Sequence, residues 1–239
     1  MDSSYIYSVV RTRTLASALA NEADVERLLI ASSRDELRTA LLESYLSLYV
    51  TEDNGWSIDS ILESHQLDAI KLLLQISPDP LVMYGYLARY DFHNVRVLTK
   101  SSIINIPYQD IVKNMSPLGL YSVEIFYENA TQGTLYRLGA ELQKAYNQAM
   151  THLEAKEVGK AEMAIDSCYW SYRRNHVEQV NDSFLRSLLA LEIDFYNAVV
   201  RLRSEVVDSF DYSKSLQSGG FIPVEKFATV ESTQNVLSI

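Results

Sequence analysis

Apolar residues recur at helical spacing through almost the whole chain, and this pattern constrains the fold most. Only 8 glycines and 5 prolines occur in 239 residues, against roughly 7% and 5% in average proteins. That is too few turn-forming residues for a β-sandwich, a barrel or a Gly-rich nucleotide-binding fold, and no sustained strand-type alternation is present. The sequence therefore predicts an all-α protein of roughly nine or ten helices joined by short loops. The clearest apolar stripe, spaced by three and four, consists of Leu135, Leu138, Leu142, Ala145, Tyr146, Ala149 and Leu153.

Helix start signals mark several boundaries. Ser33 and Glu36 have the spacing of a capping box, which predicts a helix starting just after Ser33. Ser116-Pro117 places a capping hydroxyl before a proline and predicts another helix start. Turns are predicted at Asn54-Gly55, Ser77-Pro78-Asp79-Pro80, Thr131-Gln132-Gly133 and Ser218-Gly219-Gly220.

The chain contains an internal repeat with an offset of 103 residues. The offset relates three pairs: Asp91 to Asp194, Asn94 to Asn197, and Lys100 to Arg203. Each copy is followed by a glycine-containing segment, residues 117–121 in the first and residues 219–223 in the second.

A weaker third copy lies at the N-terminus, where residues 8–13 match residues 198–203. Together the copies predict similar helical lobes of about 100 residues each. We therefore expect one lobe at residues 1–115 and a second at 116–218. Residues 219–239 are predicted to be the start of an incomplete third lobe or a C-terminal tail.

The repeated Asp-x-x-Asn motif allows two interpretations. Asp91 and Asn94 share one helix face, whereas Lys100 falls near the opposite side, so the three do not form one compact catalytic site. In the first interpretation, Asp and Asn satisfy neighbouring backbone groups or cap a helix where lobes meet. In the second, the motif is a repeated contact with a partner on a pseudo-symmetric surface.

The charge balance excludes some partners. With 31 acidic and 21 basic residues the formal net charge is −10, which argues against nucleic acid and against direct lipid insertion. The cluster Arg173-Arg174-Asn175-His176 resembles a small nucleic-acid patch. Alternatively, Arg173 and Arg174 lie at the C-terminus of a helix and complement its dipole.

Nothing in the sequence supports a catalytic site, a cofactor or a metal. The four histidines, His65, His93, His152 and His176, have no ligand-like pairing, and no P-loop or dinucleotide-binding glycine motif occurs. The single cysteine, Cys168, lies in an aromatic run and is expected to be a buried, inert thiol in a reducing compartment. No apolar stretch approaches the ~18 residues of a membrane-spanning helix, and the N-terminal residues lack the apolar core of a signal peptide.

Several of these segments together resemble one protein family. The opening YIYSVVRTR, the segment ADVERLLIASSRDELRTALLESYL, the helices YDFHNVRVLTKS and IDFYNAVVRLRS, and the turns SPLGL and SGGFI are similar to the C subunits of the prokaryotic V-type (A-type) rotary ATPases, the counterparts of the eukaryotic d-type subunit. Tyr5, Tyr7, Arg11 and Arg13 reproduce the family's opening motif, and Asp194, Asn197 and Arg203 its repeated helix. Lys100 departs from that pattern, because the family has Arg at this position. The lysine keeps the positive charge but lacks the forked guanidinium group.

The resemblance implies a non-catalytic subunit without a cofactor. Members form a funnel of three similar helical lobes that sits on the membrane rotor ring (c or K type). The funnel receives the foot of the central stalk, made of D-type and F-type subunits, and so links ATP synthesis or hydrolysis to proton or sodium transport. The expected location is cytoplasmic and peripheral to the membrane through the rotor ring. Tyr7, Arg11 and Arg13 are implied as contacts between lobes or with the stalk, although both arginines also fit simple solvated charges.

Two further expectations follow. Family members are usually about one lobe longer, so the chain is expected to be a fragment or a shortened member. The alternative function is that of a generic helical scaffold or adaptor unrelated to rotary motors. That alternative predicts no complex with rotor subunits and no lobes that superpose across the 103-residue offset.

Overall fold

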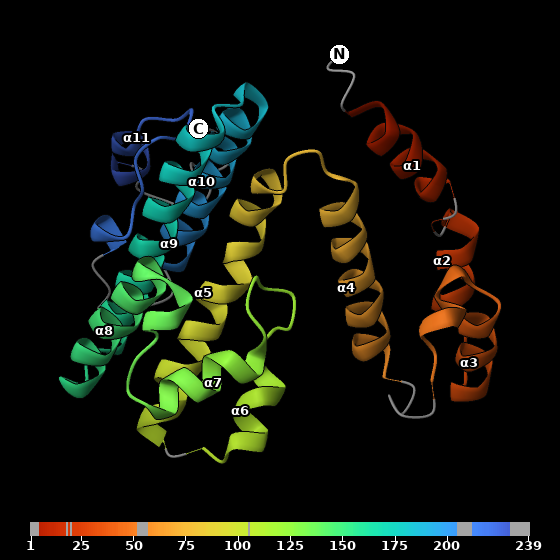
Figure 1. The fold of residues 1–239 in the computed structure, drawn as a ribbon, viewed down its shortest axis with the longest axis horizontal. Coiled ribbons are helices and arrows are strands. Elements are labelled where there is room, and N and C mark those ends of the chain that lie inside the picture. The colour runs from red at the N-terminus through yellow and green to blue at the C-terminus, as the bar shows by residue number, and fades with distance from the viewer. Residues whose placement is uncertain are drawn as a thin grey trace. The chain divides into compact units, whose positions relative to one another are not determined.

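The computed structural model describes residues 5–17, 19, 21–51, 57–104, 106–204 and 212–229. Within these residues the chain forms eleven α-helices and no β-strand (Figure 1), which confirms the all-α prediction. The predicted turn at Asn54-Gly55 lies outside the described residues. None of the helices in the described ranges combines the length and the apolar character needed to span a membrane.

The chain divides into two compact units, Met1–Met83 and Tyr84–Ile239. The expected lobe boundaries, after residues 115 and 218, both fall inside the second unit. Those boundaries were derived from the sequence repeat. The division into lobes and the funnel that they would form remain predictions.

In the first unit, side chains from three elements form a small core. Leu41, Leu46 and Ile61 are buried together. The Ser8 hydroxyl donates a hydrogen bond to the carbonyl of Ile76 and so joins the first helix to the end of the fourth. The elements are α1 (Ile6–Ala16), α2 (Glu22–Leu29), α3 (Arg34–Leu42), the 3-10 helix η2 (Tyr45–Tyr49) and α4 (Ile58–Ile76).

The start of α3 agrees with its sequence signal, with one difference. The Ser33 hydroxyl accepts a hydrogen bond from the backbone N–H of Glu36 and caps the helix as predicted. The Glu36 carboxylate, however, accepts from the backbone and the hydroxyl of Ser32 rather than from Ser33. These bonds lower the pKa of Glu36.

The second unit contains both strong copies of the repeat. In each copy a long helix is followed by a glycine-containing turn and a short helix. In the first copy these helices are α5 (Leu81–Ile104) and α7 (Val123–Thr131), and in the second they are α10 (Ser183–Ser204) and α11 (Val224–Thr229). The remaining elements are α6 (Tyr108–Asn114), the 3-10 helices η3 (Tyr136–Leu138) and η4 (Tyr212–Lys214), α8 (Ala140–Glu154) and α9 (Val158–Val180).

Helix α9 belongs to two hydrophobic cores. Its Ala161, Ile165 and Cys168 are buried in the larger core with residues of α5, α7 and α8. Further along, Trp170 and Val177 pack against α10. The two copies of the repeat are therefore joined by a shared helix, and Cys168 is the buried thiol that the sequence predicts.

The arginines of α9 correct one interpretation of the sequence. Helix α9 continues to Val180, so Arg173 and Arg174 do not lie in its last turn and do not complement its C-terminal dipole. Arg173 is buried and forms an ion pair with Glu192 of α10 at 2.5 Å. Arg174 donates to the carbonyl of Ser218. Both arginines therefore have partners within the second unit.

Phe92 and Phe195 occupy the same position in the repeat and should respond differently to truncation. Phe92 is 3% exposed and Phe195 is 67% exposed. We expect Phe92→Ala to lower the free energy of unfolding by about 3–5 kcal/mol, because it leaves a cavity in the larger core. Phe195→Ala should change it by less than about 0.5 kcal/mol. Urea titration followed by circular dichroism measures both, and similar losses for the two variants would contradict the packing.

Candidate functional site

The Asp-x-x-Asn motif of α5 binds the turn that follows it. The Asp91 carboxylate accepts hydrogen bonds from the backbone N–H groups of Leu120 and Tyr121 at 3.1 and 3.3 Å. The Asn94 side chain donates to the carbonyl of Ser116 at 2.9 Å and accepts from the N–H of the same residue at 2.8 Å. We call Asp91 and Asn94 with residues 116–121 the first turn clamp.

The motif of α10 makes the same four bonds. Asp194 accepts from the N–H groups of Phe221 and Ile222 at 2.9 and 3.2 Å. Asn197 donates to the carbonyl of Gln217 and accepts from its N–H, both at 2.8 Å. Asp194 and Asn197 with residues 217–222 form the second turn clamp. The repeat seen in the sequence is thus a repeat of a long-range hydrogen-bond arrangement.

Each turn clamp requires a glycine at the point of contact. A Cβ atom on Gly119 would overlap Oδ1 of Asp91, and one on Gly220 would overlap Oδ1 of Asp194. Only a residue without a side chain lets the turn approach the carboxylate this closely. The glycine that contacts the carboxylate in each copy, Gly119 or Gly220, is therefore required for steric reasons.

The first turn clamp also overturns a predicted helix start. Ser116-Pro117 lies in the turn, and the next helix, α7, begins at Val123 with Ser122 as its cap. The backbone groups of Ser116 are bound by Asn94, which lies 22 residues earlier. A local capping signal is overridden here by a long-range partner.

All four Asp and Asn side chains are buried. Asp91 is 1% exposed, Asp194 is 7% exposed, and Asn94 and Asn197 are fully buried. The side-chain oxygen and nitrogen atoms of both motifs form hydrogen bonds with backbone groups of the turns. This agrees with the first of the two interpretations of the motif, in which Asp and Asn satisfy backbone groups. The side chains of the site orient the backbone of the turns and present almost no surface to solvent.

The basic residues of the motif take part in a separate charged network on α9. Lys100 and Arg96 both bind Glu162, at 2.5 and 2.6 Å, and Arg96 also binds Asp166 at 2.5 Å. The Tyr196 hydroxyl donates to Asp166 from α10 at 3.0 Å. Burial raises the pKa of Asp166, while Arg96, the bond from Tyr196 and the more distant Arg203 oppose this rise.

This charged network connects the two copies of the repeat. Lys100 of the first copy binds Glu162, whereas Arg203 of the second affects Asp166 only through its charge, and Tyr196 makes the direct bond from the second copy to α9. Sequence reasoning paired Lys100 with Arg203 but missed Arg96, Asp166 and Tyr196. The spacing of Glu162 and Asp166, four residues apart on one helix face, is the signal that could have pointed to a shared binding face.

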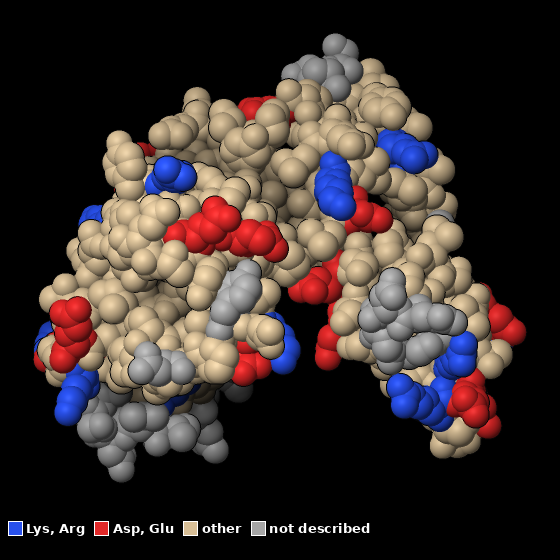
Figure 2. Space-filling view, turned by 60° about the horizontal axis from the view of Figure 1, so that its bottom comes forward, with Lys and Arg blue, Asp and Glu red and all other residues tan. Residues whose placement is uncertain are grey.

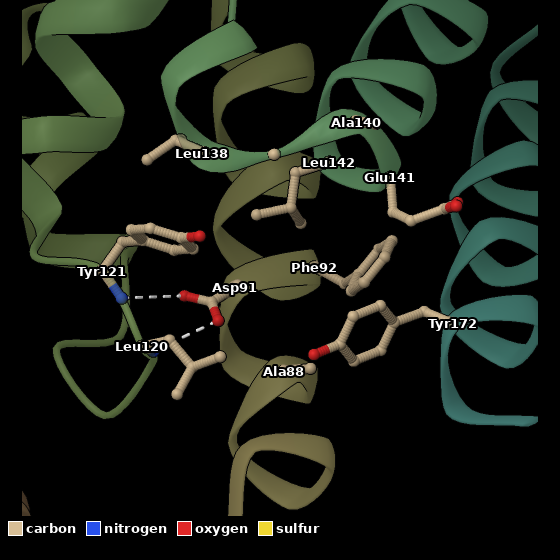
Figure 3. A pocket seen from close by; sticks show the side chains of 11 residues that line it. Ala88, Asp91, Phe92, Leu120, Tyr121, Leu138, Ala140, Glu141, Leu142 and Tyr172 are labelled. Carbon is tan, nitrogen blue, oxygen red and sulfur yellow. Dashed lines mark hydrogen bonds between the residues drawn. The ribbon is translucent and has the colours of Figure 1, made fainter. Parts of the chain in front are cut away.

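A cavity of about 170 Å³ lies beside the first turn clamp. Figure 3 shows Asp91 on α5 with its bonds to the turn and, across the cavity, Leu142 and the Tyr172 ring. Burial raises the pKa of Asp91 to about 7, against the bonds from Leu120 and Tyr121, which lower it. Within the described ranges, no three His, Cys, Asp or Glu side chains gather closely enough to hold a metal ion.

The remaining candidate residues lie on α1 in the first unit. Tyr7 is 67% exposed, and Arg11 and Arg13 are exposed as well. Helix α1 has no fully buried residue. On the face of the molecule in Figure 2, basic and acidic side chains are scattered among uncharged ones.

Comparison with known proteins places these motifs in a family. The family described as ATP synthase (C/AC39) subunit matches residues 8–239, a span that includes both turn clamps. The chain belongs to this family. No solved structure matches the chain.

Curated relatives of the C/AC39 family are distant in sequence. The C subunit of the A-type ATP synthase of Methanosarcina acetivorans is 24% identical over 97% of this chain and 68% of its own length. That of Methanocaldococcus jannaschii is 22% identical, over 84% and 54%. The C subunit of the V-type sodium ATPase of Enterococcus hirae is 22% identical, over 82% and 58%. The matched part thus spans about half to two thirds of the length of these relatives.

The turn clamps of this C/AC39 family member should contribute equally to stability. We expect Asn94→Ala and Asn197→Ala each to lower the free energy of unfolding by about 2–4 kcal/mol. Each variant removes the partner of one backbone N–H and one carbonyl of a half-buried turn residue, Ser116 or Gln217. Asn147→Ala, at an exposed position on α8, is the control and should stay within about 0.5 kcal/mol of the original chain. Urea titration measures all three, and a neutral Asn94→Ala would contradict the role of the clamp.

Asp91 should make stability depend on pH. Its pKa in the folded chain is about 7, above the ordinary Asp value of 3.8, so folding favours the protonated form. The contribution is fully present below pH 4 and is lost as the pH rises toward 7, by at most about 4 kcal/mol.

The measurement compares the original chain with Asp91→Asn, which does not titrate at this position. The difference between their unfolding free energies should shift against the original chain between pH 4 and 7 and be constant above pH 8. A difference that does not change across this range would contradict the assignment.

Proposed function

We propose that this protein is a non-catalytic coupling subunit of a rotary ATPase of the A or V type. In this role it links the central-stalk subunits of the D and F type to the membrane rotor ring and lies at the membrane surface through that ring. The single observation that carries the proposal is the family match over residues 8–239.

The packing of the second unit supports a role in transmitting force. A coupling subunit must resist bending between its two partners, so its lobes need direct connections rather than flexible linkers. Helix α9 is shared by the two hydrophobic cores, and its carboxylates bind Arg96 of one copy and Tyr196 of the other. Each long helix is also fixed to its following turn by four hydrogen bonds. Close packing of this kind has low compressibility and transmits strain.

The exposed side chains of α1 are the proposed contact with the central stalk. Tyr7, Arg11 and Arg13 project from a helix without buried residues. Tyrosine and arginine are enriched where protein surfaces bind one another. The net charge of −10 would add steering toward basic surfaces of the partners.

Complex formation tests the proposal. The full chain is co-expressed with the two central-stalk subunits, and the product is mixed with a detergent-solubilised rotor ring. We expect co-purification of one complex that contains all components. A folded chain that binds neither the stalk nor the ring would overturn the proposal and favour a helical scaffold unrelated to rotary motors.

Variants of α1 refine the same experiment. The triple variant Tyr7→Ala, Arg11→Ala, Arg13→Ala should weaken binding to the stalk at least tenfold and leave ring binding unchanged. Its control is the pair Lys113→Ala and Arg137→Ala, which removes two exposed charges of the second unit. Equal effects of the two sets would argue against a contact through α1.

A further inference from the structure

The two copies of the repeat differ in how far one helix face is covered. Ala88 and Phe92 of α5 are each 3% exposed. At the 103-residue offset they correspond to Leu191 and Phe195 of α10, which are 46% and 67% exposed. Leu191 is larger than Ala88, Phe195 is the same residue type as Phe92, and both residues of the second copy are far more exposed.

In the first copy, the helical hairpin α8–α9 covers this face. Leu142 of α8 is buried in the same core as Phe92. From α9, the rings of Tyr169 and Tyr172 lie 5.5 and 6.0 Å from the Phe92 ring, measured between centroids. Figure 3 shows Leu142 and Tyr172 on either side of Phe92.

The uncovered face of the second copy carries exposed apolar side chains at helical spacing. We define the α10 patch as Leu191, Phe195 and Val199 on α10 with Phe221 of the adjoining turn. Their exposed fractions are 46%, 67%, 42% and 65%. Phe221 occupies the place of Leu120, which lines the cavity beside Ala88 and Phe92 in the first copy.

Helix α10 is apolar on two faces, and its partner α9 covers only one of them. Leu189, Ile193 and Val200 are buried, and the first two pack with residues of α9. The α10 patch lies on the other face, where no described residue buries it. A helix that is apolar on both sides is normally buried on both sides, and a contiguous exposed apolar patch marks an interaction site.

We propose that the α10 patch binds a helical hairpin constructed like α8–α9 and supplied by polypeptide outside residues 1–239. The repeat specifies the occupant, because the same hairpin covers the equivalent positions in the first copy. The hairpin places an aliphatic side chain at the position of Leu142 and an aromatic one at that of Tyr172, against Leu191 and Phe195.

One position distinguishes this occupant from the first-copy hairpin. Val199 stands where the first copy has Arg96, which binds the carboxylates of Glu162 and Asp166. The hairpin on the α10 patch therefore presents an apolar side chain at this point instead of an acidic pair. The α10 patch follows from the repeat and not from the coupling role, so either proposal can fail without the other.

A peptide-binding experiment tests the patch with the full 239-residue chain. The probe is a fluorescently labelled synthetic peptide of residues 136–180, in which Glu162 and Asp166 are replaced by alanine. We expect saturable binding, seen as a rise in fluorescence anisotropy. Phe195→Glu in the protein should weaken it at least tenfold, because the hairpin would bury an unpaired charge. Leu191→Glu serves as a second variant with the same expected result.

The control variant is Tyr136→Glu, which adds the same charge at a 78% exposed aromatic position of the same unit. It should bind the probe as the original chain does, and circular dichroism establishes that all variants are folded. Absence of probe binding would overturn the proposal. Probe binding that neither Phe195→Glu nor Leu191→Glu weakens would also overturn the proposal. In that case the peptide would bind in place of the chain's own α8–α9 hairpin and not at the α10 patch.

Sedimentation of the unlabelled chain distinguishes a second copy as the occupant. A concentration-dependent dimer that Phe195→Glu abolishes would assign the patch to self-association and overturn the hairpin. A monomer at all concentrations, together with probe binding that depends on Phe195, would support it.

Discussion

The architecture of the second unit depends on a buried carboxylate and a buried amide that bind the backbone of a distant turn. An Asp accepts from two consecutive N–H groups, and an Asn three residues later binds both backbone groups of one earlier residue in the same turn. Backbone groups that leave water need such partners, because an unpaired buried N–H or carbonyl is costly. The two clamps therefore fix where the chain reverses after each long helix, and the helices that follow take their positions from that reversal.

This dependence explains why the repeat consists of so few matching residues. Apolar core positions tolerate exchange between side chains of similar size, so they diverge between the copies. The Asp, Asn and Gly residues of the clamps do not tolerate such exchange. Asp and Asn bind the turn backbone, and Gly119 and Gly220 contact the carboxylates where a Cβ would not fit. The burial of the two long helices diverges as well, because α8 and α9 cover α5 while α10 keeps an exposed apolar face. A repeat in sequence thus marks equivalent backbone geometry without requiring equivalent surroundings.

Much of this organisation could be predicted from the sequence, and what could not be predicted depends on long-range contacts. Helical periodicity gave the all-α fold, and Ser33 marked a true helix start. The same kind of local signal failed at Ser116-Pro117, because Asn94 binds Ser116 from 22 residues away. The burial of Arg173 depends on Glu192 in another helix. The cavity beside Asp91 needs α5, η3, α8 and α9 together.

The most direct test of the clamps is hydrogen exchange at the four turn amides that the carboxylates bind. We predict that the N–H groups of Leu120, Tyr121, Phe221 and Ile222 exchange as slowly as amides within α5 and α10, although they lie in turns. Exchange at the rate of ordinary exposed turn amides would show that the carboxylates do not hold the turns. That result would contradict the account.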